Sequence, residues 1–568
     1  MHLKNIHGFP PFVIIFFLLL TIGFHFGCKG KTTALTEKWA STPKVIDIQE
    51  RLAQFIPTEI SYDESLLNDE QTQVLEKLIL AAKQMDKIFW KQASHTGLAV
   101  KKELEEMDDP SAKDFLKYLE INFGPYDRLD ENNPFIGEQA KSPGAGFYPA
   151  DMTSEDFLVY ITSNPEKKEE LEDTYTVVKR EDSSLFAVPY NEEYREDLEP
   201  AVQYLKEAAG ITTNASLKKF LNQRAADLLS NDYYQSDSDW IDLKDNLVEI
   251  VIGPFEVYED ALNGLKAAYE AFVYINDFEE MEKIKGYLKF LDEMQKTLPV
   301  AQKYKDQDIA GLASPLNVAI EVFTAGDTKS GVQTLAFVLP NDERIREEKG
   351  TKKVFLKNVM EAKFNQILVP ISKKVLSEAD AEYVSFWAYF NEVVLHEICH
   401  ALGVNYVTYP DGTKTTVNKA LKENYSAIEE AKATVVGLQS IPLLIEKGWI
   451  PADKEKEIYT TYLAGMFRSM RFGLHEAHGM GTLLQYNFLR EQGGFVYDEN
   501  LEQFHVDENK IRDSITKLAQ VLLILEGDGN YENVAEFLER YGHPDALTEN
   551  MVAKLNDIPV DIAPEYKF

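Results

Sequence analysis

The chain contains very few cysteines, and this scarcity limits how the folded protein can be held together. Only Cys28 and Cys399 occur among 568 residues. If Cys28 is modified, as proposed below, no disulfide can form within the chain. An exported protein of this kind must then rely on the size of its core. The chain is long enough for two or three lobes, and a hydrophobic content of 44% is typical of globular proteins.

Positively charged residues are also scarce. Lysine and arginine total 59, whereas aspartate and glutamate total 94, so the formal net charge is −35. A surface this acidic repels the phosphates of nucleic acids. We therefore expect no nucleic-acid partner. The sequence also contains no internal repeat and no low-complexity segment.

The N-terminus carries an apolar stretch that is only marginally long enough to span a membrane. After Lys4, residues 12–24 are apolar and uncharged, and the segment ends at Cys28. This order is typical of a secretory signal, and the cysteine resembles the lipidation site of a bacterial lipoprotein. We predict that residues 1–27 are a signal peptide and that residues 28–45 form a lipid-anchored tether. The alternative is an uncleaved membrane anchor; in both cases the protein is exported and membrane-bound, in the periplasm or at the outer membrane.

Hydrophobic periodicity divides the remaining chain into a mixed part and a helical part. We expect a mixed α/β lobe over residues 46–375 and a mainly helical lobe over residues 376–568, and therefore an α+β fold that is mainly helical. Within the mixed lobe the pattern predicts three strands, at residues 245–253, 331–340 and 365–370.

A zinc-type pentapeptide opens the helical lobe. His396-Glu397-Ile-Cys-His400 spells H-E-x-x-H, and the apolar pattern of residues 381–395 predicts a helix that leads into it, with Gly403 as a stop. Positions i and i+4 share one face of a helix, so both imidazoles can reach one ion. Glu397 lies beside them, where a carboxylate can accept a proton from the activated water. The alternative is a helix with two incidental core histidines; Cys399 we expect to be a packing residue.

A catalytic zinc ion needs three protein ligands, and the pentapeptide supplies two. The third ligand has several candidates downstream, namely Glu423, Glu429, Glu430, His475 and His478. Ser426 is placed to begin a helix, which would make Glu429 part of a capping box. Glu430 lies about 100° further around the helix, on a face of small residues that allows a neighbouring helix to come close.

Taken together, these motifs resemble the dipeptidyl peptidase III family of zinc exopeptidases. That family pairs its zinc helix with a downstream Glu-Glu-x-Arg-Ala-Asp-type motif, and this chain has Glu429-Glu430-Ala-Lys432-Ala-Thr434. The resemblance implies that Glu430 is the third ligand of one zinc ion per chain. It also implies that Glu429 supports a ligand histidine without binding the metal itself.

Further matches extend from about residue 245 to residue 495. In the family pattern, Glu256 and Asn341 hold the N-terminus of the substrate, while Tyr258 and His478 stabilise the transition state. Two family residues are replaced here, an asparagine by Val338 and an arginine by Thr482.

The resemblance also implies a fold and an activity. It predicts two lobes with a cleft between them, and a β-barrel-like sheet in the mixed lobe. The expected function is zinc-dependent release of dipeptides from the free N-terminus of oligopeptides. Two alternatives stay open, a non-catalytic peptide- or metal-binding lipoprotein on the same scaffold and an H-E-x-x-H endopeptidase. The sequence does not indicate an oligomeric state.

Overall fold

The computed structural model describes residues 48–305, 315–471 and 477–568. The predicted signal peptide, the tether and Cys28 lie outside these residues. Within the described part of the chain, no helix combines the length and the apolarity needed to cross a lipid bilayer.

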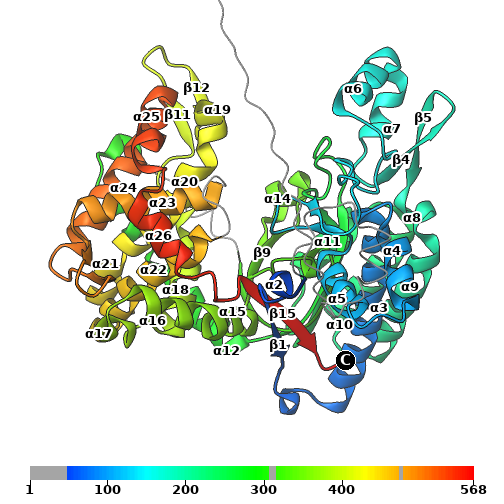
Figure 1. Cartoon of the computed structure of the whole chain (residues 1–568), viewed down its shortest axis with the longest axis horizontal. Coiled ribbons are helices and arrows are strands. Elements are labelled where there is room, and N and C mark those ends of the chain that lie inside the picture. The colour runs from blue at the N-terminus through cyan, green and yellow to red at the C-terminus, as the bar shows by residue number, and fades with distance from the viewer. Residues whose placement is uncertain (1–47, 306–314, 472–476) are drawn as a thin grey trace, which may run out of the picture.

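Two lobes stand side by side and are joined at one end (Figure 1). The predicted fold class, a mainly helical α+β protein with two lobes, is confirmed. The lobe shown on the right combines a sheet with the helices α2 (Ile48–Leu52), α3 (Asp69–Ala93), α4 (Gly97–Glu106), α5 (Ala112–Asn122), α6 (Ser154–Ser163), α7 (Lys168–Glu172), α8 (Tyr190–Glu193), α9 (Arg195–Ile211), α10 (Ala215–Ser230), α11 (Tyr234–Ile241) and α14 (Glu343–Lys349).

The other lobe is built almost entirely from helices. These are α15 (Lys357–Lys363), α16 (Val369–Val375), α17 (Glu378–Ala381), α18 (Phe386–Cys399), α19 (Val417–Leu421), α20 (Tyr425–Gln439), α21 (Ile441–Glu446), α22 (Glu455–Met470), α23 (Ala477–Glu491), α24 (Ile511–Asp528), α25 (Tyr531–Tyr541) and α26 (Ala546–Ala553). Two small hairpins, β11 (Tyr406–Thr408) with β12 (Lys414–Thr416) and β13 (Phe495–Asp498) with β14 (Gln503–Val506), complete this lobe.

The main sheet is mixed and curled. Its order is β6 (Val248–Glu256), β7 (Ala268–Asn276), β8 (Leu316–Gly326), β10 (Lys352–Leu356) and β9 (Ala336–Leu339), with only β8 and β10 parallel. The amide of Asn341, just beyond β9, donates a hydrogen bond of 3.0 Å to the carbonyl of Phe255 in β6. Because β6 and β9 are the first and last strands of this sheet, their contact shows that the sheet bends round on itself, as predicted.

Two of the three predicted strands are present, and one is wrong. The segment 245–253 overlaps β6, and the segment 331–340 contains β9. Residues 365–370 instead form a π-helical turn, Phe364–Leu368, that leads into α16. A short apolar run is compatible with a buried strand or with a buried helix. Here Ile367 and Leu368 are fully buried, and the helices on both sides continue through the run.

Three segments cross the boundary expected near residue 375. The last strand, β15 (Asp561–Tyr566), pairs in parallel with β1 (Phe55–Ile60) in the mixed lobe. In the opposite direction, α13 (Leu291–Thr297) contacts the helical lobe, since the Gln295 amide exchanges hydrogen bonds of 2.9 and 3.0 Å with the backbone of Gly403. Helices α15 and α16 also pack on helices of that lobe. The chain therefore crosses between the lobes several times, and these crossings connect the helical lobe to the mixed lobe.

A buried carboxyl group in β8 leads to a prediction about stability. Glu321 is 3% exposed and accepts a hydrogen bond of 2.7 Å from the Tyr566 hydroxyl in β15. Burial raises the pKa of Glu321 to about 7. The folded state then binds the proton more tightly than the unfolded chain, so stability is lost as the pH rises from about 4.5 to about 7. Each pKa unit corresponds to about 1.4 kcal/mol, which gives a cost of ~3 kcal/mol above pH 7.

We expect Glu321→Gln to raise the melting temperature at pH 8, because the amide oxygen can still accept the Tyr566 bond and carries no charge. The gain should shrink toward zero at pH 4.5, where the glutamate is protonated in the folded state. Thermal unfolding of both proteins across this pH range tests the prediction, with the exposed Glu565→Gln on β15 as the matched control. An equal gain at both ends of the range would contradict it.

Candidate metal centre

Two helices of the helical lobe position the metal-site residues. Helix α18 begins after Ser385, whose hydroxyl accepts a hydrogen bond from the Ala388 N–H. Helix α20 packs closely against it, because Gly437 has no side chain and a Cβ there would lie 3.2 Å from the Cβ of Leu395. The predicted helix is therefore present, but it begins at Phe386 and not at residue 381, and it ends at Cys399, four residues before Gly403.

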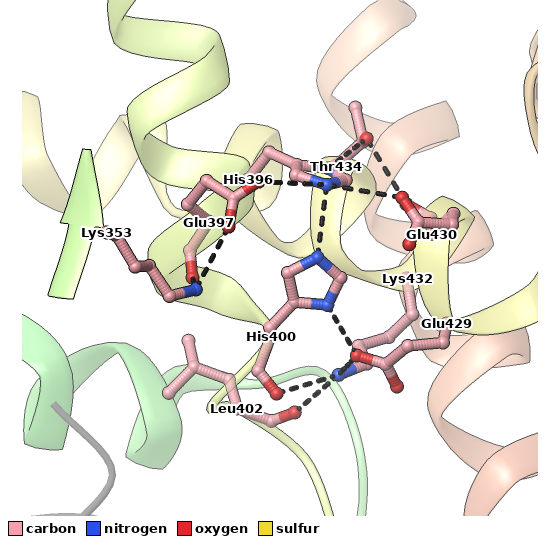
Figure 2. A network of polar contacts seen from close by, with 9 residues as sticks. All are labelled: Lys353, His396, Glu397, His400, Leu402, Glu429, Glu430, Lys432 and Thr434. Carbon is pink, nitrogen blue, oxygen red and sulfur yellow. Dashed lines mark hydrogen bonds and ion pairs between the residues drawn. The ribbon is translucent and has the colours of Figure 1, made fainter. Parts of the chain in front are cut away.

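The imidazoles of His396 and His400 face each other at one point. Their Nε2 atoms are 3.1 Å apart, and the other ring nitrogens are occupied (Figure 2). His396 Nδ1 lies 2.8 Å from the hydroxyl of Thr434, and His400 Nδ1 lies 2.8 Å from Glu429 Oε1. A carboxylate only accepts hydrogen bonds, and the Thr434 hydroxyl donates its own proton to the Glu430 carbonyl at 3.3 Å. Each Nδ1 is therefore the donor, which leaves both Nε2 lone pairs free for a cation.

Glu430 provides a third donor atom at this point. Its Oε2 lies 3.4 Å from His396 Nε2. Two ligands of a tetrahedral zinc ion, each about 2.0–2.1 Å from the metal, are ~3.3 Å apart. The two spacings around His396 Nε2, 3.1 Å to His400 and 3.4 Å to Glu430, each match this value. Zinc also matches a donor set of two imidazoles and a carboxylate.

Glu397 is the competing carboxylate. Its Oε1 lies 4.0 Å from His396 Nε2, and together with the two histidines it forms a group whose ligand atoms lie within 4.8 Å of one another. The other oxygen, Oε2, is 3.0 Å from the ammonium of Lys353. Burial alone would raise the pKa of Glu397, but the charge of Lys353 and the two histidines lowers it overall. Glu397 thus lies further from His396 Nε2 than Glu430 does, and it is held in its ionised form.

Lys353 connects the two lobes at this site. It belongs to β10 of the mixed lobe, and its Nζ donates both to the carboxylate and, at 2.6 Å, to the backbone carbonyl of Glu397 in α18. A cavity of about 400 Å³ opens here between the lobes. Its lining includes Val338, Arg346 and Lys353 from the mixed lobe and Glu397 and His400 from the helical lobe. Glu397 and His400 thus line a cleft between the lobes, as expected.

Glu429 supports His400 and does not form the capping box that Ser426 suggested. Helix α20 begins at Tyr425, so Ser426 lies inside the helix. The carboxylate of Glu429 accepts bonds of 2.8 Å from His400 and 2.9 Å from Lys432. Burial opposes ionisation, but Lys432 and His400 hold the pKa of Glu429 well below its ordinary range. Glu429 is therefore an anion that orients the imidazole of His400.

The predicted substrate-binding pair is brought together by the curl of the sheet. The Asn341 amide lies 3.5 Å from Glu256 Oε1. Burial raises the pKa of Glu256, and the Asn341 bond partly offsets this effect. Tyr258, two residues further on, is 84% exposed, and among the described residues it makes no hydrogen bond to the metal-site residues. The contact between Glu256 and Asn341 shows that these two residues lie together although 85 residues separate them in the sequence.

His478 lies in the first turn of α23, but its side chain is outside the described part of the structure, as is the whole of His475. Cys399 is fully buried, and burial raises the pKa of its thiol to about 12. A buried and protonated thiol agrees with the predicted packing role.

Three residues of the site were not found by sequence reasoning. Lys353 is one of many lysines, and nothing in its neighbourhood of the sequence connects it to the zinc helix. Lys432 and Thr434 were noted only as replacements within a motif, whereas the structure shows Lys432 against Glu429 and Thr434 against His396. The i+3 spacing of Glu429 and Lys432 on one helix was the available indication.

Comparison with known proteins gives consistent results. The sequence profile of peptidase family M49 matches residues 150–421. Nudix hydrolase 3 of Arabidopsis thaliana is 34% identical over 577 residues, covering 92% of this chain and 74% of that protein. Dipeptidyl peptidase 3 of Nematostella vectensis is 28% identical over 186 residues, covering 32% of this chain and 24% of that protein.

Solved structures extend the similarity to nearly the whole chain. DPP III from Caldithrix abyssi is 46% identical, with a TM-score of 0.90, and the match covers 91% of this chain and 99% of that one. Dipeptidyl-peptidase III from Corallococcus sp. strain EGB is 39% identical, with a TM-score of 0.78 and coverage of 92% and 97%.

Proposed function

The chain belongs to the dipeptidyl peptidase III family, and from this premise we propose that His396, His400 and Glu430 bind one zinc ion that serves peptide hydrolysis. The protein is a metallopeptidase that releases dipeptides from the N-termini of peptides. The observation that carries the assignment of the metal site is that His396 Nε2 lies 3.1 Å from His400 Nε2 and 3.4 Å from Glu430 Oε2. The name of the Arabidopsis relative describes another hydrolase, and about a quarter of that protein lies outside the match.

The chemistry divides between the metal and the surrounding side chains. A bound zinc ion would acidify its water and polarise the scissile carbonyl. Glu397 takes the proton from the attacking water and delivers it to the leaving amine. Lys353 keeps this carboxylate ionised and fixed in place before the proton arrives. Tyr258 and His478 stabilise the negative charge that develops on the carbonyl oxygen.

Glu256 and Asn341 hold the ammonium group of the substrate in this proposal. A carboxylate accepts hydrogen bonds from an ammonium group, and the Asn341 amide keeps Glu256 in position. Recognition of the free N-terminus lets the enzyme count residues from that end. The replacement of a family asparagine by Val338 reduces the number of polar groups available for this task.

Localisation forms a separate part of the proposal. The apolar residues 12–24 followed by Cys28 support export and a lipid anchor, with the peptidase facing the periplasm or lying at the outer membrane. Metabolic labelling with a fatty acid analogue tests it, because Cys28→Ala should abolish labelling and Cys399→Ala should not.

Product analysis with paired peptides tests the activity. We expect dipeptides from peptides with a free N-terminus, and at least about tenfold slower cleavage once the N-terminus is acetylated, because the ammonium contact is lost. Glu256→Gln should raise the KM for free peptides more than it lowers kcat. Internal cleavage of blocked peptides would indicate the endopeptidase alternative. Absence of products from protein with one zinc ion per chain would indicate the non-catalytic alternative.

A further inference from the structure

Tyr258 has almost no contacts of its own, although its hydroxyl is proposed to act at one point beside the scissile carbonyl. The residue is 84% exposed, and within the described part of the chain its hydroxyl forms no hydrogen bond. Strand β6 ends two residues earlier, at Glu256. A donor to a developing oxyanion is effective only when it is held in place before the reaction. The position of Tyr258 must therefore come from the backbone on either side of it.

The next residue, Glu259, is anchored in the interior of the mixed lobe. Its side chain is 2% exposed, and its Oε2 lies 2.9 Å from Arg128 Nη1. The other oxygen, Oε1, is paired with the ammonium group of Lys141. Burial alone would raise the pKa of Glu259, but these two cations lower it overall. Each oxygen of this buried carboxylate thus has a cation of its own, as a buried charge requires.

Arg128 is itself fixed to the helices of the mixed lobe. Its backbone N–H donates a hydrogen bond of 3.0 Å to the side chain of Asn122, and its Nε donates one of 3.1 Å to the carbonyl of Asn122, at the end of α5. The guanidinium group also lies 5.7 Å from the ring centroid of Phe89 in α3. Glu259 therefore connects the loop after β6 to two helices of this lobe.

Asp260 closes the turn around Tyr258, and its contacts differ from those of Glu259. Its N–H donates a bond of 3.1 Å to the Val257 carbonyl. Its carboxylate accepts a bond of 3.0 Å from the Tyr148 hydroxyl. It also accepts bonds of 2.9–3.1 Å from the backbone N–H groups of Leu262, Asn263, Leu265 and Lys266. Most bonds of Asp260 lie within the loop and set its shape, whereas both ion pairs of Glu259 attach the loop to a distant segment of the chain.

We propose that Glu259, held between Arg128 and Lys141, is a positioning residue that fixes Tyr258 for its part in peptide hydrolysis. The two residues are adjacent in the chain, so a displacement of Glu259 moves the backbone that carries the tyrosine ring. The inference rests on the role proposed above for Tyr258. The first of the two tests below uses neither zinc nor peptide, so a failure of the inference can be told apart from a failure of the proposed function.

The first test observes the ring of Tyr258 directly by fluorine NMR spectroscopy. Protein that carries 3-fluorotyrosine only at position 258 should give one narrow resonance, and Glu259→Gln should shift and broaden it, because the neutral amide no longer attracts the two cations. Asp239→Asn, which removes the charge of a buried aspartate 2.8 Å from Lys219 in the same lobe, is the matched control and should leave the resonance unchanged. An unchanged resonance in Glu259→Gln, or one that is equally broad in the wild type, overturns the positioning role.

The second test is a double-mutant cycle on dipeptide release. Tyr258→Phe should lower kcat by ~10²–10³-fold, as the loss of one oxyanion donor does. Glu259→Gln should lower kcat by ~10–100-fold, because a misplaced group contributes less, and it should change KM much less. The double variant should be no slower than Tyr258→Phe, since Glu259 acts through that residue. Losses that multiply overturn the inference. Full activity of Tyr258→Phe would refute the proposed role of the tyrosine, and the fluorine resonance would still decide whether Glu259 fixes its ring.

Lys141→Met is a milder change that decides the matter if Glu259→Gln does not fold. It leaves Glu259 paired with Arg128 and removes one of the two cations. We expect a shifted fluorine resonance and a kcat below that of the wild type, with Asp239→Asn again as the control. A resonance and a kcat equal to those of the wild type would overturn the proposal.

Discussion

Replacing Glu397 by glutamine is expected to slow peptide hydrolysis by ~10²–10⁴-fold, the usual contribution of a positioned general base. The amide cannot accept the proton of the attacking water, and it cannot pass a proton to the leaving amine. The backbone carbonyl of residue 397 still accepts the 2.6 Å bond from Lys353, so α18 should keep its place against β10. The effect is measured as the steady-state rate of dipeptide release from a peptide with a free N-terminus.

The zinc content of Glu397→Gln shows whether its loss of activity comes from a missing base or from a missing metal ion. Because Glu397 lies outside the three proposed ligands, Glu397→Gln should still bind one zinc ion per chain with wild-type affinity. The surface variant Glu382→Gln, on the segment before α18, controls for the substitution itself and should keep full activity. Turnover within about tenfold of the wild type, with zinc bound, would exclude Glu397 as the base.

Much of the helical lobe could be predicted because its periodic patterns are long. Residues 381–395 contain enough turns for the 3.6-residue period to be unambiguous, and α18 forms there. The run at residues 365–370 is too short to distinguish a strand from a buried helix, and it was assigned wrongly. The crossing of β15 back to β1 was also beyond prediction, because strand pairing over a separation of about 500 residues leaves no local pattern.

The candidate site was predictable to the extent that its residues lie in motifs. His396, Glu397, His400, Glu429 and Glu430 are found from spacing and resemblance. Lys353 is not, because it reaches the site only through tertiary packing, from β10. It is a charged group beside a motif, and its effect depends on burial, which the sequence does not show. The helix cap predicted at Ser426 failed for a related reason: Glu429 is used by His400 from a different helix.

The identity of the third ligand gives the second large prediction. Glu430 and Glu397 both present a carboxylate near His396, at 3.4 and 4.0 Å. If Glu430 is the ligand, Glu430→Gln should weaken zinc binding by more than the ~10–100-fold typical of residues that only support a ligand. Activity at limiting zinc should fall by the same factor, since the metal is lost and not merely repositioned.

Three matched glutamate-to-glutamine variants can be ranked by how much zinc affinity each one loses. We expect the loss of zinc affinity to be largest for Glu430, intermediate for Glu429 and close to zero for Glu397, with chelator competition as the measurement. The order follows from the contacts, because Oε2 of Glu430 is spaced from His396 Nε2 as a ligand would be, Glu429 bonds only to the far nitrogen of His400, and Glu397 is held by Lys353. A reversed order, with Glu397 most sensitive, would assign the metal to the His396, Glu397 and His400 group. The pentapeptide would then supply every ligand, and Glu397 could no longer act as the base.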